Sequence, residues 1–157
     1  MLETTLVYIE QDGKLLMLHR VRKQEDVNAG KWIGVGGKIE PGETPEACML
    51  RETREETGLT LQRWAARGIV DFRSGDWKER MHLFTADCFE GTLDPDCDEG
   101  VLAWVERERV LTLPLWAGDR VFLRLLEEGE PFFRLTLIYE GERLAQAWLN
   151  GRLLEQT

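Results

Sequence analysis

The chain has 157 residues, of which 43% are hydrophobic and 31% are charged, and its net charge at pH 7 is −9. An acidic surface disfavours polymeric nucleic acid and anionic membranes, because both bind basic patches, so we expect neither as a partner. Three cysteines without a Cys-x-x-Cys spacing favour neither a disulfide framework nor a zinc site. With no signal peptide or long apolar run visible, we expect one cytoplasmic domain over residues 1–157.

The first part of the chain is strand-like. Residues 4–10 and 14–20 are expected to form two strands around a turn at Asp12–Gly13. Residues 21–31 are polar and loop-like. Residues 32–37, with the sequence WIGVGG, predict a strand whose glycines let a backbone carbonyl approach a ligand.

A helix beginning at Pro45 and ending before Gly58 is unusual for its charge. Thr44 is a good N-cap for it, and Gly58 suits the left-handed position after its end. One arc, about a quarter of the circumference wide, carries its acidic residues and one thiol: Cys48, Glu52, Glu55 and Glu56. The opposite arc is only thinly apolar: Ala47, Leu50, Thr53 and Thr57. The like charges repel, and a cation held by hard oxygen ligands, Mg²⁺ or Mn²⁺ in preference to zinc, would remove that repulsion.

The rest of the chain predicts further strands and a second helix. The expected strands are residues 59–72, 77–89, 101–105, 132–139 and 143–149, with an acidic loop at 91–100 and a helix at 116–128. Several strands with two or three helices suit a mixed sheet that is covered on both faces.

Residues 37–59 resemble the complete Nudix box, Gly-x5-Glu-x7-Arg-Glu-U-x-Glu-Glu-x-Gly-U, in which U is an aliphatic residue. Every fixed position matches. Thr53 alone departs, since it stands where an aliphatic residue is usual, and this puts the local packing in doubt. The resemblance implies an α/β protein, the Nudix α/β/α sandwich with a mixed β-sheet between helices. It also implies hydrolysis of a nucleoside diphosphate that is linked to another group.

For the metal, the resemblance implies Mg²⁺, with Mn²⁺ possible, on the acidic side of the helix. Glu52 and Glu56 would be direct ligands, and Glu55 would bind the metal or its water. The carbonyl of Gly36 would complete the shell. Arg51 would act in catalysis by orienting the carboxylates, through Glu43.

Outside the box, Glu99 in the acidic loop matches a glutamate that contributes to the metal site or to water activation in the MutT-like branch. Asp98 is the alternative, and a solvated loop acid is the simpler interpretation of either. Arg20 resembles the basic phosphate contact of the family, with an exposed strand-end cation as the alternative. Lys38, directly after the glycines, is a second candidate to contact phosphate.

The chain is also similar to the MutT-type oxidised purine nucleoside triphosphatases. The similarity is carried by AGKW at residues 29–32, by Trp104 and by LWAGD at residues 115–119. In that group a tryptophan stacks on the purine and acidic side chains bind its edge. Trp116 and Asp119 match those positions, although core packing is an alternative for Trp116.

Two positions depart from that group. Gly118 stands where the best-known member has the first of two adjacent aspartates, and Ile33 replaces an asparagine that contacts the base. We therefore expect a Mg²⁺-dependent pyrophosphohydrolase of oxidised purine nucleoside triphosphates such as 8-oxo-dGTP. The alternatives are a hydrolase of ADP-ribose or another nucleoside diphosphate derivative, and a non-catalytic nucleotide-sensing module. The partner would be a small nucleotide, and the protein a monomer or a homodimer.

Overall fold

The computed structural model describes residues 1–21 and 28–155, so much of the loop expected at residues 21–31 lies outside the described residues. The strands are β1 (Leu2–Gln11), β2 (Lys14–His19), β3 (Trp32–Ile33), β4 (Val35–Lys38), β5 (Thr60–Ser74), β6 (Trp77–Glu90), β7 (Asp96–Cys97), β8 (Gly100–Glu106), β9 (Phe133–Glu140), β10 (Arg143–Leu149) and β11 (Arg152–Leu153). The helices are α1 (Pro45–Thr57), α2 (Arg107–Val110) and α3 (Ala117–Glu127). Within the described ranges, no helix is both long and apolar enough to span a membrane.

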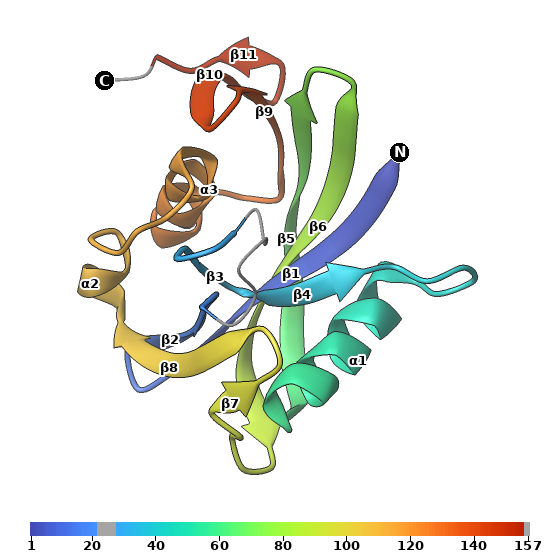
Figure 1. Ribbon diagram of the computed structural model, residues 1–157, viewed down its shortest axis with the longest axis vertical. Helices are drawn as coiled ribbons and strands as arrows, with labels where there is room; N and C mark the ends of the chain where they lie inside the picture. Colours follow the sequence, from blue (N-terminus) through green and yellow to red (C-terminus); the bar gives the residue numbers. More distant parts are fainter. Residues whose placement is uncertain (22–27, 156–157) are drawn as a thin grey trace.

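The strands form one mixed sheet (Figure 1). Its order is β11-β10-β9-β5-β6-β1-β2-β8-β7, with β3 beside β2 and β4 beside β1. β1 pairs in parallel with β6, and β5 pairs in parallel with β9, whereas the other pairs are antiparallel. The expected mixed sheet is confirmed.

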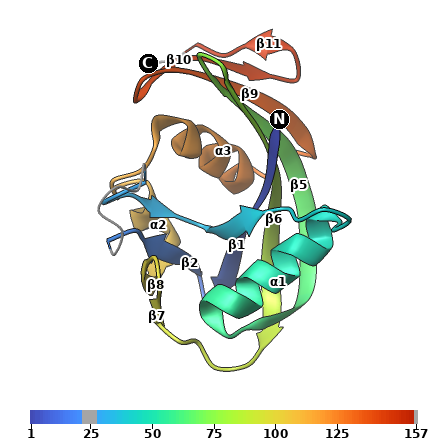
Figure 2. The same ribbon diagram turned by 45° about the vertical axis from the view of Figure 1, so that its right-hand side comes forward.

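Alternate residues of β1 serve two cores, as the period of two in a strand requires. Leu6 and Tyr8 belong to the core that contains Phe122 of α3. Val7 and its neighbour two residues on, Ile9, belong to the core that contains Met49 of α1. The two helices therefore cover opposite faces of the central strand, as Figures 1 and 2 show, and the expected α/β/α sandwich is confirmed.

The single strand expected at residues 32–37 is two strands. β3 pairs with β2, whereas β4 pairs with β1, so the chain changes partner between them. Gly34 occupies the crossing point, where a β-carbon would lie 2.9 Å from the carbonyl oxygen of Val7. The short elements α2, β7 and β11 were not expected from the sequence.

Helix α1 has the ends that its sequence predicts. The Thr44 side chain accepts a hydrogen bond from the backbone of the first turn, and Gly58 has a φ of 80°. The expected apolar arc is partly wrong, because Ala47 is exposed and Met49 is buried in its place. Thr53 is fully buried, and its hydroxyl has no hydrogen-bond partner among the described residues. Its departure from an aliphatic residue therefore leaves a buried polar atom unpaired.

Candidate active site

Arg51 connects the acidic side chains of α1. Its Nε donates to Oε2 of Glu43 over 2.8 Å, and its Nη1 donates to Oε1 of Glu52 over 2.8 Å. The same Nη1 lies 3.2 Å from Oε2 of Glu55, one helical turn further on. The hydrogen bonds from Arg51 lower the pKa of Glu43 to about 2. The link expected between Arg51 and Glu43 is thus present, and it fixes the guanidinium that holds the other two carboxylates.

Glu56 is the buried carboxyl group of this set. Its Oε2 accepts a hydrogen bond from the backbone N–H of Gly36 over 3.3 Å. Burial, followed by the hydrogen-bonded carboxyl of Glu99, raises the pKa of Glu56 to about 9. Two adjacent carboxylates cannot both ionise at low cost without a positive charge beside them. The structure thus brings Glu99 to the helix, whereas Asp98 is exposed.

Two glycines let the carboxylates approach the backbone. A β-carbon on Gly37 would lie 2.4 Å from the carboxyl carbon of Glu52. A β-carbon on Gly36 would lie 1.9 Å from the carbonyl oxygen of Thr5 in the neighbouring strand. A larger residue at position 36 would push β4 away from β1, whereas one at position 37 would displace the carboxylate of Glu52. The approach of a backbone carbonyl to a ligand, which the sequence predicts for these glycines, stays a prediction.

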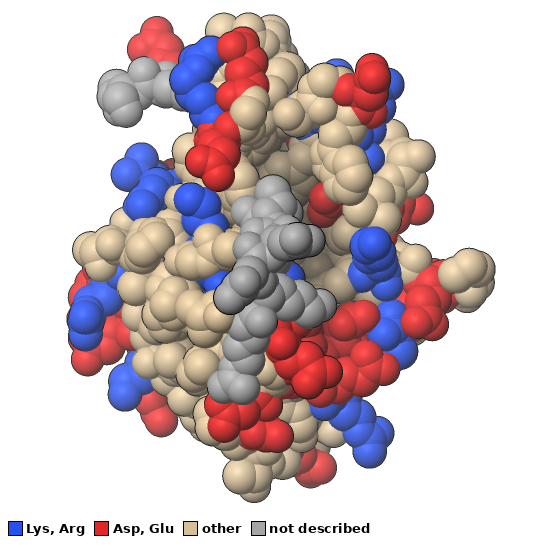
Figure 3. All heavy atoms as spheres, in the orientation of Figure 1, with Lys and Arg blue, Asp and Glu red and all other residues tan. Residues whose placement is uncertain are grey.

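The donor set fits a hard divalent cation. Glu52, Glu56 and Glu99 offer carboxylate oxygens, and burial raises the pKa of Glu52 as well as that of Glu56. Figure 3 shows the acidic side chains gathered over α1. Within residues 1–21 and 28–155, however, no three Asp, Glu, His or Cys side chains already form a cation site, and Arg51 holds Glu52 and Glu55. Oxygen ligands of this kind suit Mg²⁺ or Mn²⁺.

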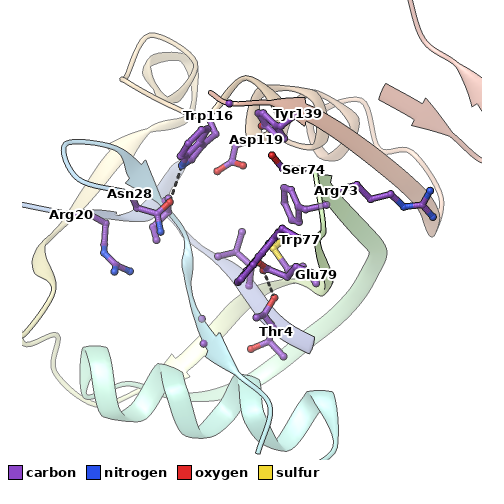
Figure 4. Close-up of a pocket in the computed structure, with 18 residues that line it drawn as sticks. Thr4, Arg20, Asn28, Arg73, Ser74, Trp77, Glu79, Trp116, Asp119 and Tyr139 are labelled. Atoms are coloured by element: carbon purple, nitrogen blue, oxygen red, sulfur yellow. Dashed lines mark hydrogen bonds between the residues drawn. The ribbon is translucent and has the colours of Figure 1, made fainter. Parts of the chain in front are cut away.

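A cavity of about 560 Å³ reaches the start of α3 (Figure 4). Gly36 and Arg20, which neighbour the carboxylate cluster, line one end, but none of the clustered carboxylates themselves lines the cavity. Arg20 also donates from Nη1 to Oε2 of Glu99 over 3.1 Å, so it belongs to both the cluster and the cavity. Trp116 and Asp119 line the other end. One cavity therefore connects residues beside the carboxylate cluster with Trp116 and Asp119.

Trp116 is held by neighbours on several sides. Its Nε1 donates to Oδ1 of Asn28 over 2.7 Å. The Lys31 ammonium lies 5.1 Å from the centre of the indole ring. Tyr139 meets the ring edge-on, with 5.7 Å between the ring centres. Trp116 is half-buried, packs against the core that contains Phe122, and also lines the cavity, so both its packing role and its stacking role stay predictions.

Asp119 is a buried carboxyl group without a hydrogen-bond partner in the part of the chain that the structure describes. Only 6% of the residue is exposed, and its side chain makes no hydrogen bond to the described residues. Burial, with a smaller contribution from the charge of Glu79, raises the pKa of Asp119 to about 7. Glu79 lines the same cavity and accepts a hydrogen bond from Oγ1 of Thr4 over 2.7 Å. Such a carboxyl group gains most from a ligand that supplies the missing hydrogen bond.

Comparison with known proteins agrees with this geometry. Residues 2–126 match the model of the NUDIX domain family. The chain belongs to the Nudix family. The Nudix hydrolase YvcI of Bacillus subtilis (strain 168) is 30% identical over 141 residues, 85% of this chain and 84% of that protein. The oxidized purine nucleoside triphosphate hydrolase of Danio rerio is 34% identical over 130 residues, 82% of this chain and 81% of that protein. A mutator MutT protein from Bacillus halodurans superposes with a TM-score of 0.87 at 26% identity, covering 96% of this chain and 98% of that one.

Several expected residues of this Nudix hydrolase do not line the cavity, namely the clustered residues Arg51, Glu52, Glu55, Glu56 and Glu99, and also Lys38. Lys38 is exposed at the end of β4 and does not line the cavity. Its carbonyl oxygen accepts a hydrogen bond from Nη2 of Arg51 over 3.3 Å. The described contacts therefore use its backbone, and its contact with phosphate stays a prediction.

Many residues that line the cavity escaped sequence reasoning, among them three polar residues. Asn28, Glu79 and Tyr139 line it beside Trp116 and Asp119. The alternation of β6 does place Glu79 on the same face as Met81, which also lines the cavity. No comparable signal connects Asn28 or Tyr139 to the Nudix box, because each reaches the cavity through tertiary packing.

Proposed function

We propose that this Nudix hydrolase is a Mg²⁺-dependent pyrophosphohydrolase of purine nucleoside triphosphates. Its substrates would be oxidised purines such as 8-oxo-dGTP, and its products the monophosphate and pyrophosphate. One observation carries the proposal: a single cavity of about 560 Å³ runs from Gly36 and Arg20, beside the carboxylate cluster, to Trp116 and Asp119. A triphosphate would lie at the first end and a base at the second. The name of the Danio rerio relative supports the same substrate class.

At the phosphate end, Glu52, Glu56 and Glu99 would hold the cation, together with the carbonyl of Gly36. When bound, Mg²⁺ neutralises phosphate charge and lowers the pKa of a bound water. Arg51 orients the carboxylates that it contacts, and this fixes where the substrate phosphates must lie. Glu55, the most exposed of the set, would bind the cation or its water.

Arg20 is suited to hold the transferred group. Its guanidinium contacts Glu99, and Arg20 also lines the cavity. A phosphate bound in the cavity beside Arg20 would therefore meet a planar, permanently charged donor. Phosphoryl substitution depends chiefly on positioning and charge stabilisation, so a protein nucleophile is not required. The residues at this end provide both.

At the base end, Trp116 would stack on the purine and Asp119 would bind its edge. Lys31 lies over the indole ring, and Asn28 fixes the orientation of that ring. An aromatic face beside a carboxyl group suits a flat, polar base. The three cysteines are unpaired, in keeping with a reducing cytoplasm as the place of action.

The test is release of pyrophosphate from a nucleotide panel with and without Mg²⁺. We expect release from 8-oxo-dGTP and smaller release from dGTP and dATP, in each case abolished by a chelator. Turnover of ADP-ribose with no triphosphate turnover would replace the proposal with a nucleoside diphosphate hydrolase. Binding of nucleotides without turnover of any would indicate a non-catalytic sensing module.

A further inference from the structure

Tyr139 on β9 places its hydroxyl group at the start of α3. The hydroxyl oxygen accepts a hydrogen bond from the backbone N–H of Gly118 over 2.7 Å. A β-carbon on Gly118 would lie 2.5 Å from that oxygen and 2.6 Å from Cδ1 of Leu137. The phenol therefore occupies the space that a side chain at position 118 would need. This gives a physical reason for the glycine at position 118.

The hydroxyl group of Tyr139 is available as a donor. Its oxygen already accepts from Gly118, and among the described residues no acceptor for its proton lies within hydrogen-bonding distance. Burial, followed by the charge of Asp119, raises the pKa of Tyr139, so the phenol keeps its proton. Tyr139 and Asp119 both line the cavity, and Figure 4 shows them side by side near Trp116.

We propose that Tyr139 is a specificity-determining residue whose hydroxyl donates a hydrogen bond to an acceptor on the base edge while Asp119 binds the neighbouring N–H. This inference deepens the proposed function and rests on it. A 6-keto purine offers that pair of groups, O6 as the acceptor and N1–H as the donor. A 6-amino purine would instead set a donor, its N6–H, against the donating hydroxyl of Tyr139. The pocket should therefore favour the keto form of the purine edge.

A purely structural role for Tyr139 predicts a different result. The hydroxyl also satisfies a free N–H in the first turn of α3, which has no side-chain cap. Loss of that contact alone would lower stability and weaken the binding of every purine to the same degree. Loss of a donor to O6 would weaken only purines that carry O6. The ratio between two substrates that differ at position 6 separates the two roles.

The experiment compares dITP, which carries O6 and N1–H, with the triphosphate of purine 2′-deoxyriboside, which carries neither. We expect Tyr139→Phe to lower kcat/KM for dITP by about three- to tenfold relative to the analogue, the size of one neutral hydrogen bond. Tyr8→Phe is the matched control. Tyr8 also has a buried hydroxyl, without a partner in the described chain, but it does not line this cavity. Its removal should leave the ratio unchanged.

An unchanged dITP-to-analogue ratio in folded Tyr139→Phe would overturn the inference while leaving the hydrolase assignment intact. A wild-type protein that hydrolyses no purine triphosphate would instead overturn the proposed function. Melting curves establish that each variant folds. If Tyr139→Phe does not fold, Gly118→Ala provides the second variant, because its β-carbon displaces the hydroxyl. It should reduce the same ratio, and an unchanged ratio there would equally contradict the inference.

Discussion

The two ends of the cavity satisfy their polar groups in different ways. At the carboxylate end, Arg51 contacts Glu43, Glu52 and Glu55, and the backbone of Gly36 binds Glu56. At the base end, buried Asp119 has no hydrogen bond to any described residue. The first end is held in place by the protein itself, mostly by residues of one short segment. The second is assembled from distant strands and a helix, and its carboxyl group lies at the cavity wall. The residues proposed for catalysis are therefore mostly close together in the sequence, whereas those proposed for selectivity are brought together by the tertiary fold.

The largest effect is expected at the carboxylate end. Glu56→Gln should lower turnover by about a thousandfold at saturating Mg²⁺, because it removes a charge needed for cation binding or proton transfer. The fold should survive, since an amide can still accept the Gly36 N–H bond. Steady-state kinetics and circular dichroism measure the two effects. Glu46→Gln, the same exchange at an exposed position of α1, is the control. Turnover within about threefold of wild type would refute the role of Glu56.

At the base end, Asp119 should make stability depend on pH. Its pKa is raised to about 7 by burial and then by Glu79, whereas an unfolded Asp has a pKa near 3.9. The folded state therefore keeps a proton that the unfolded chain releases, so stability falls as pH rises from about 4 to about 7. Asp119→Asn does not titrate, and its stability relative to wild type should rise over that window by up to about 4 kcal/mol. Burial, and then the charge of Asp119, raises the pKa of Tyr8 and that of Tyr139, so both keep their protons over this window.

Urea denaturation at pH 4.5, 6 and 8 would measure this difference. The control is Asp87→Asn, because the hydrogen bond from Arg63 lowers the pKa of Asp87. Its linkage has the opposite sign and lies below the unfolded pKa near 3.9, so the stability difference between Asp87→Asn and wild type should stay nearly constant from pH 4.5 to 8. Parallel pH profiles for wild type and Asp119→Asn would show that Asp119 titrates normally.

Trp116→Ala should raise KM for all purine nucleotides, since stacking accepts any aromatic face. The increase should correspond to a loss of about 1–3 kcal/mol of binding free energy. The ratio between oxidised and normal purines should change little. Trp148→Ala is the control, because Trp148 lies on β10 outside the cavity. Steady-state KM values for dGTP, 8-oxo-dGTP and dATP decide the outcome. An effect limited to one purine would mean that Trp116 reads the base edge instead of its face.

The smallest effect is expected among the buried residues of α1. Thr53→Val should stabilise the protein by about 1 kcal/mol, because it removes a buried hydroxyl without a partner in the described chain. Thr57→Val should do the reverse, since the hydroxyl of Thr57 donates to the carbonyl of Thr53 over 2.6 Å and accepts from the N–H of Leu59 over 3.0 Å. Urea midpoints measure both. A destabilised Thr53→Val would mean that its hydroxyl is satisfied in solution.

Sequence reasoning succeeds where the determinants are contiguous. The ends of α1 follow from Thr44 and Gly58, and the spacing of the Nudix box brings Arg51 to Glu43. Sequence reasoning fails where packing against another helix or strand determines which residues are buried. The rotation of α1 about its axis is set by docking on β1 and β4, so the buried residue is Met49 instead of Ala47.

The base end shows the same limit more strongly. Tyr139 reaches the cavity because β9 pairs in parallel with β5. No local sequence pattern predicts which strand will be the parallel neighbour of another. The division of residues 32–37 into β3 and β4 also depends on two different partners. A family resemblance indicated Trp116 and Asp119. It could not indicate Tyr139, whose hydroxyl occupies the space beside Gly118.

The parallel pairing of β5 with β9 has a consequence for the order of folding. Pairing Gly68 with Phe133 closes a long loop of chain, whereas Arg51 meets Glu43 within a few turns of backbone. Loop-closure entropy delays such distant contacts, so the docking of β9 should come late. An intermediate with α1 already docked would carry the cation ligands of the helix and yet fail to distinguish one base from another. The Gly118 amide, protected only once Tyr139 arrives, would report that last step in pulsed hydrogen exchange.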